Sequence, residues 1–138
     1  MALPLAVTWI GDAAAYFAGS AWGRRKLAPS LSPNKSWEGF WAEVVAGAAA
    51  AVGWILVVRA LGMTAPSAGI AVFALVGALI AVSAVVGDLV ESLLKREAGV
   101  KDSGTLFPGH GGVMDRIDSL LFTIPSAYLA LVLLGGGP

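Results

Sequence analysis

The chain has 138 residues, a formal net charge of zero and no cysteine. Only 13% of its residues are charged, against roughly 25% in a soluble domain, and its mean hydropathy is +0.80. These values exclude disulfides, thiolate metal sites and a basic surface for nucleic acid. They predict a membrane protein, and we expect residues 1–138 to form a single membrane domain.

The predicted elements are apolar segments, each long enough to cross a bilayer as a helix, which takes about 20 residues. Four such segments follow one another, at about residues 3–21, 40–61, 68–89 and 119–135. The expected fold class is therefore all-α, a polytopic membrane protein with about four transmembrane helices and two polar cytoplasmic loops. Pro125 is expected to kink the fourth helix.

Several charged residues lie within or beside these segments. Asp12 interrupts the first, Glu43 and Arg59 lie near the two ends of the second, and Asp88 ends the third. An ionisable group at membrane depth is costly and is a functional hypothesis by default. Solvation in a loop does not explain Asp12 and Asp88, so both are candidates for a site.

The lysines and arginines lie almost entirely in two connections. Those between the first and second segments and between the third and fourth are Arg24, Arg25, Lys26, Lys35, Lys95, Arg96, Lys101 and Arg116. The remaining cation, Arg59, can extend from a helix end on the other side. Because an excess of cations marks cytoplasmic loops, both polar connections are expected at the cytoplasmic face.

The first connection contains the sequence LSPNKSWEG. Ser32–Asn34 reads as a turn, Ser36 as the cap of the following helix and Glu38 as an acid in its first turn. Lys35 stands at this helix entrance, beside exposed backbone N–H groups. A lysine in that position suits a phosphate, so we expect Lys35 to reach the site from this connection.

Two helix faces carry polar groups at helical spacing. At the end of the third segment one face holds Asp88, Glu91, Ser92 and Lys95. In the first segment one face holds Asp12, Tyr16, Gly19 and Gly23. Each face could instead have a structural role. The face on the third segment would then be an amphipathic helix end at the membrane interface. The face on the first segment would be a packing face with one paired acid.

The second connection contains the run GHGGVMDRID. Its glycines let the backbone approach a ligand closely, and Asp115 and Asp118 then share one helix face. A plain hairpin would use Asp115 as a helix cap and Asp118 as a dipole partner, yet the two charges repel each other. Mg²⁺ prefers carboxylates with phosphate oxygens and would remove that repulsion. His110 could act as a base or a phosphate donor, and a lone histidine in a turn is also typical of a structural role.

Acids that hold a metal, with lysine and arginine beside them, suggest phosphoryl or nucleotidyl transfer. The run SLLKREAGVKDSGTLFPGHGGVMDRID, residues 92–118, resembles the signature of the phosphatidate cytidylyltransferase family, also called CDP-diglyceride synthetases. The upstream stretch GDAAAYFAGSAWGRRKLAPSLSPNKSWEG is similar to another region of that family. Long motifs at fixed spacing make the resemblance specific.

The resemblance implies an inner-membrane, multi-pass enzyme whose active site faces the cytoplasm. It would make CDP-diacylglycerol and pyrophosphate from CTP and phosphatidic acid, with Mg²⁺ and a neighbouring K⁺. Asp88, Asp115 and Asp118 are expected to hold the metal, and Asp88, Asp115 and Lys35 to serve catalysis. Substrate binding is assigned to Ser32, Ser92, Lys95, Arg96, Lys101, His110 and Arg116.

The family's members are roughly twice as long, so the resemblance covers their C-terminal half. We therefore expect the cleft to be completed by an N-terminal half or by a second copy in a homodimer, within a lipid bilayer. Alternatives are a CTP-dependent lipid-alcohol kinase, an archaeal-type CDP-lipid synthase, and a non-catalytic fragment that packs against a full-length homologue.

Overall fold

The computed structural model describes residues 2–64, 66–100 and 114–135, with side chains described from residue 119 onward in the last range. It is mostly helical, as predicted. The elements in chain order are α1 (Ala2–Trp22), β1 (Lys26–Ala28), β2 (Ser32–Ser36), α2 (Trp37–Ala60), α3 (Ile70–Glu97) and α4 (Met114–Leu133).

The first connection corrects the all-α expectation. Strands β1 and β2 form an antiparallel hairpin, in which Lys26 pairs with Ser36 and Ala28 with Ser32. The prediction of a turn at Ser32–Asn34 was wrong. These residues lie in β2, and the turn precedes them, where the Leu31 N–H donates to the Ala28 carbonyl at 3.2 Å.

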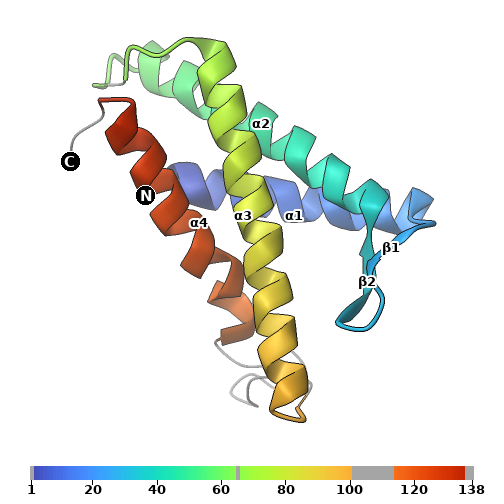
Figure 1. The fold of residues 1–138 in the computed structure, drawn as a ribbon. Helices are drawn as coiled ribbons and strands as arrows, with labels where there is room; N and C mark the ends of the chain where they lie inside the picture. The colour runs from blue at the N-terminus through green and yellow to red at the C-terminus, as the bar shows by residue number, and fades with distance from the viewer. Residues whose placement is uncertain (1, 65, 101–113, 136–138) are drawn as a thin grey trace.

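The helices form two antiparallel pairs that cross each other (Figure 1). Helices α1 and α2 run alongside one another and are joined by the hairpin, while α3 and α4 form the second pair. Helix α3 also packs on α2, so the core lies where the pairs cross. Its buried residues are Leu3, Val7, Ala51, Val76, Ile80, Ala81 and Ala127.

Glycine makes the close contact between α2 and α3 possible. A Cβ at Gly77 would collide with the Gly47 carbonyl and would lie 2.6 Å from the Ala51 Cβ. Small residues let helix backbones approach closely, which is a common way to pack helices in membranes. Polar side chains add links to α4, since Thr8 contacts Thr123 at 3.4 Å and Ser126 contacts Ser83 at 3.1 Å.

The outer surface suits a lipid environment. Many large apolar side chains are exposed on the helices, such as Trp9, whose exposed fraction is 67%. Two of the described helices, α2 and α3, are long and apolar enough to cross a membrane. The described apolar part of α4 is the shorter segment Ser119–Leu133. Length and composition thus support two of the four expected spans.

Candidate active site

The hairpin is fastened to the start of α2 by backbone and cap interactions. Ser36 is the N-cap of α2, and its hydroxyl accepts the Gly39 N–H at 3.2 Å. The Trp37 N–H donates to the Arg25 carbonyl at 2.9 Å, and the Glu38 carboxylate accepts the Arg25 N–H at 3.3 Å. The predicted cap at Ser36 and the acid in the first turn are confirmed. This fastening fixes Lys35, next to the cap, relative to the helices.

A cleft of about 290 Å³ lies where the hairpin meets α1, α2 and α3. Its charged or polar lining comes from all of these elements: Asp12, Tyr16, Ser32, Asn34, Lys35, Ser36, Glu43 and Asp88. Asp12 and Asp88 therefore face one space, although they come from different helices. The polar faces predicted on the first and third segments both contribute to this cleft.

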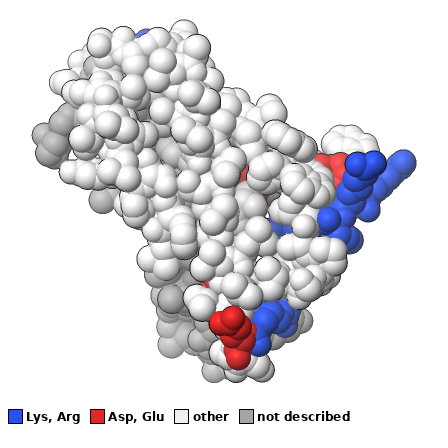
Figure 2. Space-filling view, viewed as in Figure 1, with Lys and Arg blue, Asp and Glu red and all other residues white. Residues whose placement is uncertain are grey.

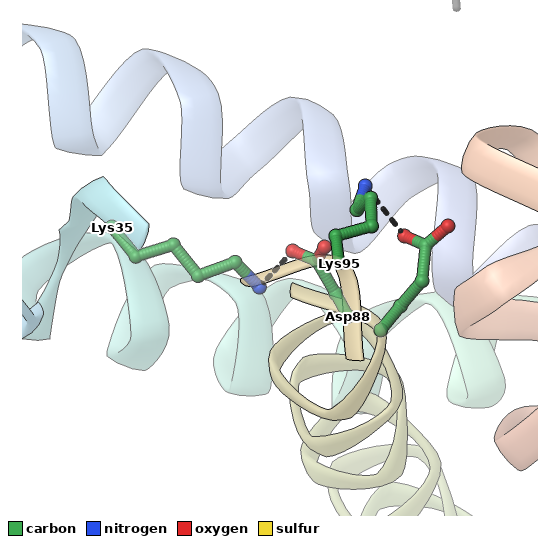
Figure 3. Close-up of polar contacts among 4 residues, drawn as sticks. Lys35, Asp88 and Lys95 are labelled. Atoms are coloured by element: carbon green, nitrogen blue, oxygen red, sulfur yellow. Dashed lines mark ion pairs between the residues drawn. The ribbon is translucent and has the colours of Figure 1, made fainter. Parts of the chain in front are cut away.

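Lys35 and Asp88 form an ion pair across the cleft (Figure 3). Lys35 extends from β2 and Asp88 from α3, so the pair links the first connection to the third helix. The side chains are 24% and 32% exposed, so both are within reach of a ligand in solution. The structure thus brings together two of the residues to which the sequence assigned catalytic roles.

Glu43 is a cleft residue to which the sequence reasoning assigned no role. It lies in α2, and only 5% of it is exposed. A Cβ at Gly11 would come within 3.0 Å of the Glu43 Cγ, so α1 leaves room for this side chain by having glycine there. The signal that could have found it is an acid inside an apolar segment, which is expensive at membrane depth.

A second hollow, of about 240 Å³, lies between the hairpin and the last turns of α3. It is lined by Leu31, Ser32, Pro33, Asn34, Ser92, Lys95 and Arg96. Ser32 and Asn34 line both hollows, so the two spaces adjoin along β2. The Lys95 ammonium is 3.0 Å from the Glu91 carboxylate, one turn earlier in α3. Four residues predicted to bind substrate therefore surround one space.

The remaining predicted site residues lie beyond what the structure describes. Lys101 and His110 are outside the described residues, and Asp115, Arg116 and Asp118 are in the first turns of α4 with undescribed side chains. The expected pairing of Asp88 with Asp115 on one metal thus stays a prediction.

The charged residues of the described part gather toward one side of the molecule. Figure 2 shows them around the hairpin and around the C-terminal end of α3, while the opposite part of this view is almost free of them. Lysines and arginines at two adjoining hollows can neutralise the charges of phosphate groups.

The donor chemistry of the cleft fits a hard divalent cation, because its acids offer only carboxylate oxygens. Within residues 2–64, 66–100 and 119–135, however, no three acidic or histidine side chains are grouped closely enough to hold a metal ion. A cation at Asp88 would therefore need further ligands from phosphate oxygens or from side chains outside those ranges.

An apolar helical protein whose charged residues line adjoining clefts at one side has the features of a membrane protein with a polar site. The sequence model of the cytidylyltransferase family matches residues 1–134, and the chain belongs to that family. The resemblance drawn from the motifs is thereby confirmed.

Curated relatives named phosphatidate cytidylyltransferase come from several bacteria. The Brucella suis protein is 48% identical over 124 residues, which cover 90% of this chain and 43% of that protein. The Pseudomonas aeruginosa protein is 47% identical over 132 residues, covering 96% and 46%. The Bacillus subtilis protein is 43% identical over 127 residues, covering 92% and 45%. The chain spans about half the length of the curated relatives it matches.

Proposed function

We propose that this chain carries the catalytic cleft of a phosphatidate cytidylyltransferase, which transfers the cytidylyl group of CTP to phosphatidic acid. The main structural support is the Lys35–Asp88 ion pair, which lies in a cleft beside the hollow lined by Lys95 and Arg96. Family membership and the names of the relatives support this reaction. The products are CDP-diacylglycerol and pyrophosphate.

The reaction needs no covalent enzyme intermediate, because the nucleophile is already an anion. A phosphate oxygen of phosphatidic acid forms a bond to the α-phosphorus of CTP. The bond from that phosphorus to the bridging oxygen breaks, and pyrophosphate leaves with the electron pair. The residues of the chain then have two tasks, which are to align the reactants and to neutralise charge.

Lys35 lines the cleft and would neutralise phosphate charge there, and Lys95 and Arg96 would do the same in the adjoining hollow, which they line. Ser32 and Ser92 offer hydroxyl donors there, and Lys101, His110 and Arg116 are further proposed phosphate contacts. Asp88, Asp115 and Asp118 would hold Mg²⁺, with K⁺ beside it. Bound there, Mg²⁺ would supply Lewis-acid stabilisation of the phosphate oxygens.

The proposed setting is the cytoplasmic face of the inner membrane, with the chain multi-pass. Both charged connections would then meet CTP from the cytoplasm, and phosphatidic acid would enter from the bilayer. Tyr16, at the rim of the cleft, is 72% exposed, so the cleft is open on the α1 side. Further helices or a second copy of the chain would cover that side.

The test uses two proteins in mild detergent. One is residues 1–138, and the other is the Pseudomonas aeruginosa relative with its matching part replaced by this chain. Each is assayed for Mg²⁺-dependent formation of CDP-diacylglycerol from phosphatidic acid and labelled CTP, with ATP as the control nucleotide. We expect turnover by the chimera and much slower turnover by residues 1–138 alone.

Asp115→Asn in the chimera should abolish turnover, since it removes a proposed metal ligand. A folded chimera that forms no CDP-diacylglycerol would overturn the proposed function. Robust turnover by a monodisperse monomer of residues 1–138 would show that no further helices or second copy are needed.

A further inference from the structure

Glu43 is a buried carboxylate that the proposed reaction does not use. It lies in an otherwise apolar stretch of α2, lines the cleft, and has 5% of its surface exposed. Taking a carboxylate out of water is costly unless a cation or hydrogen bonds compensate. Its presence therefore calls for an interaction with a positive charge inside the cleft.

The helices are shaped around this side chain. The Gly11 position of α1 lies against the Glu43 Cγ, and a methyl group there would come within 3.0 Å of it. Because α1 packs against the aliphatic part of the Glu43 side chain, the carboxylate is confined to the cleft and cannot extend along the surface of α2.

Lys35 is the cation among the described residues that line the cleft. Glu43, Asp12 and Asp88 line the same cleft as Lys35. The ammonium of Lys35 is in an ion pair with Asp88. One lysine is thus placed among three carboxylates from three helices, and it contacts the one on α3.

We propose that Glu43 is a positioning residue, a second counter-charge that keeps the Lys35 ammonium in the cleft when the Asp88 carboxylate is engaged by a cation. The inference rests on the proposed function only in giving Asp88 that cation. A lysine side chain is flexible enough to exchange partners across a small cleft. Without Glu43, a Lys35 released from Asp88 would lose a carboxylate partner that holds it in the cleft before the phosphates bind.

Cross-linking tests the placement without any need for turnover. A carbodiimide joins a carboxylate to an amine that contacts it, and peptide mass spectrometry identifies the partners. In the wild-type chain we expect the Lys35–Asp88 amide. In Asp88→Asn we expect the Lys35–Glu43 amide to rise several-fold, and to vanish in Asp88→Asn/Glu43→Gln.

A folded Asp88→Asn protein in which Lys35 joins Asp12, or joins no carboxylate, would overturn the inference. Asp88→Ala repeats the test if the asparagine variant does not fold. Adding Mg²⁺ to the wild-type chain should likewise move cross-links from Asp88 to Glu43. If only the Mg²⁺ arm fails, Asp88 holds no Mg²⁺ in the absence of phosphate ligands, and the neighbourhood of Lys35 and Glu43 stands.

Kinetics in the chimera then separate positioning from structural support. Glu43→Gln should lower kcat roughly tenfold, as expected for losing one partner of a partly buried charge pair. Glu43→Asp should recover part of that loss, and the exposed Glu97→Gln should match wild type. Lys35→Ala/Glu43→Gln should be no slower than Lys35→Ala alone, because Glu43 acts through Lys35. Additive losses, with a lowered melting temperature, would assign Glu43 a merely structural role.

Discussion

The two ends of α2 handle their charged residues in opposite ways. Near its start, Lys35 pairs with Asp88, which lies on a helix far along the chain. Near its end, Arg59 donates to the carbonyls of Pro66 and Ala68, the latter at 2.5 Å, within the connection that follows it. Its guanidinium also lies 5.9 Å from the ring centre of Phe73 at the start of α3.

The two charges differ in what they contact. Arg59 donates hydrogen bonds to backbone carbonyls of the short connection between the helices, and so it stabilises that connection locally. Lys35 and Asp88 join distant elements around a space that a ligand can enter. We infer that the charge at the hairpin end serves binding and that the charge at the Arg59 end serves folding. Three substitutions test this contrast.

The largest effect is expected at Asp88. Asp88→Asn keeps the size of the side chain and removes its charge, so it should abolish cation binding in the cleft. Metal ions supply several kcal/mol of transition-state stabilisation, so turnover of the chimera should fall by roughly a thousandfold or more. The measurement is the rate of CDP-diacylglycerol formation at saturating Mg²⁺, alongside the melting temperature. Near-normal turnover would discard the assignment of Asp88.

Lys35 should show the next largest effect. Lys35→Ala removes a phosphate contact and leaves the Ser36 cap of α2 in place. Charge-assisted hydrogen bonds contribute about 1.5–3 kcal/mol, so kcat/KM for CTP should fall on the order of 10- to 100-fold. Lys35→Arg is the matched control that keeps the charge, and it should retain more activity than Lys35→Ala. A wild-type rate for Lys35→Ala would leave the lysine a purely structural role.

The helical architecture could be predicted from the sequence because hydropathy and capping residues are local signals. Ser36 predicted the start of α2, and its hydroxyl does cap that helix. The continuation of α3 past Asp88 could also be predicted, because Asp88, Glu91 and Lys95 stand at helical spacing, and the helix does extend to Glu97. Hydropathy alone would end this segment near Asp88, whereas the helix ends at Glu97 and is followed by Gly99, whose φ of +69° suits glycine.

The hairpin was missed because Pro33 reads as a turn residue. A proline has no N–H to donate to a neighbouring strand. In a two-stranded ribbon, however, each strand has an edge without a partner, and a proline that faces this edge costs no hydrogen bond. The ion pair was also beyond the sequence, which indicated that Lys35 and Asp88 share a membrane side but gave no distance between them. Only the crossing of the two helix pairs brings the Lys35 side chain of β2 within reach of Asp88 on α3.

Arg59 is expected to give the smallest effect, and on stability rather than activity. Arg59→Gln removes the charge and the donors that reach both the Pro66 and Ala68 carbonyls. Because these bonds are exposed, their loss should cost about 0.5–1.5 kcal/mol of unfolding free energy. Lys35→Gln is the matched control at the other end of α2, and the pair is compared in the chimera by thermal unfolding and by turnover. Arg59→Gln should lower the melting temperature and leave turnover nearly unchanged. Lys35→Gln should lower turnover and leave the melting temperature nearly unchanged. A large loss of turnover in a stable Arg59→Gln protein would mean that both ends of α2 serve the reaction, and the contrast between them would fail.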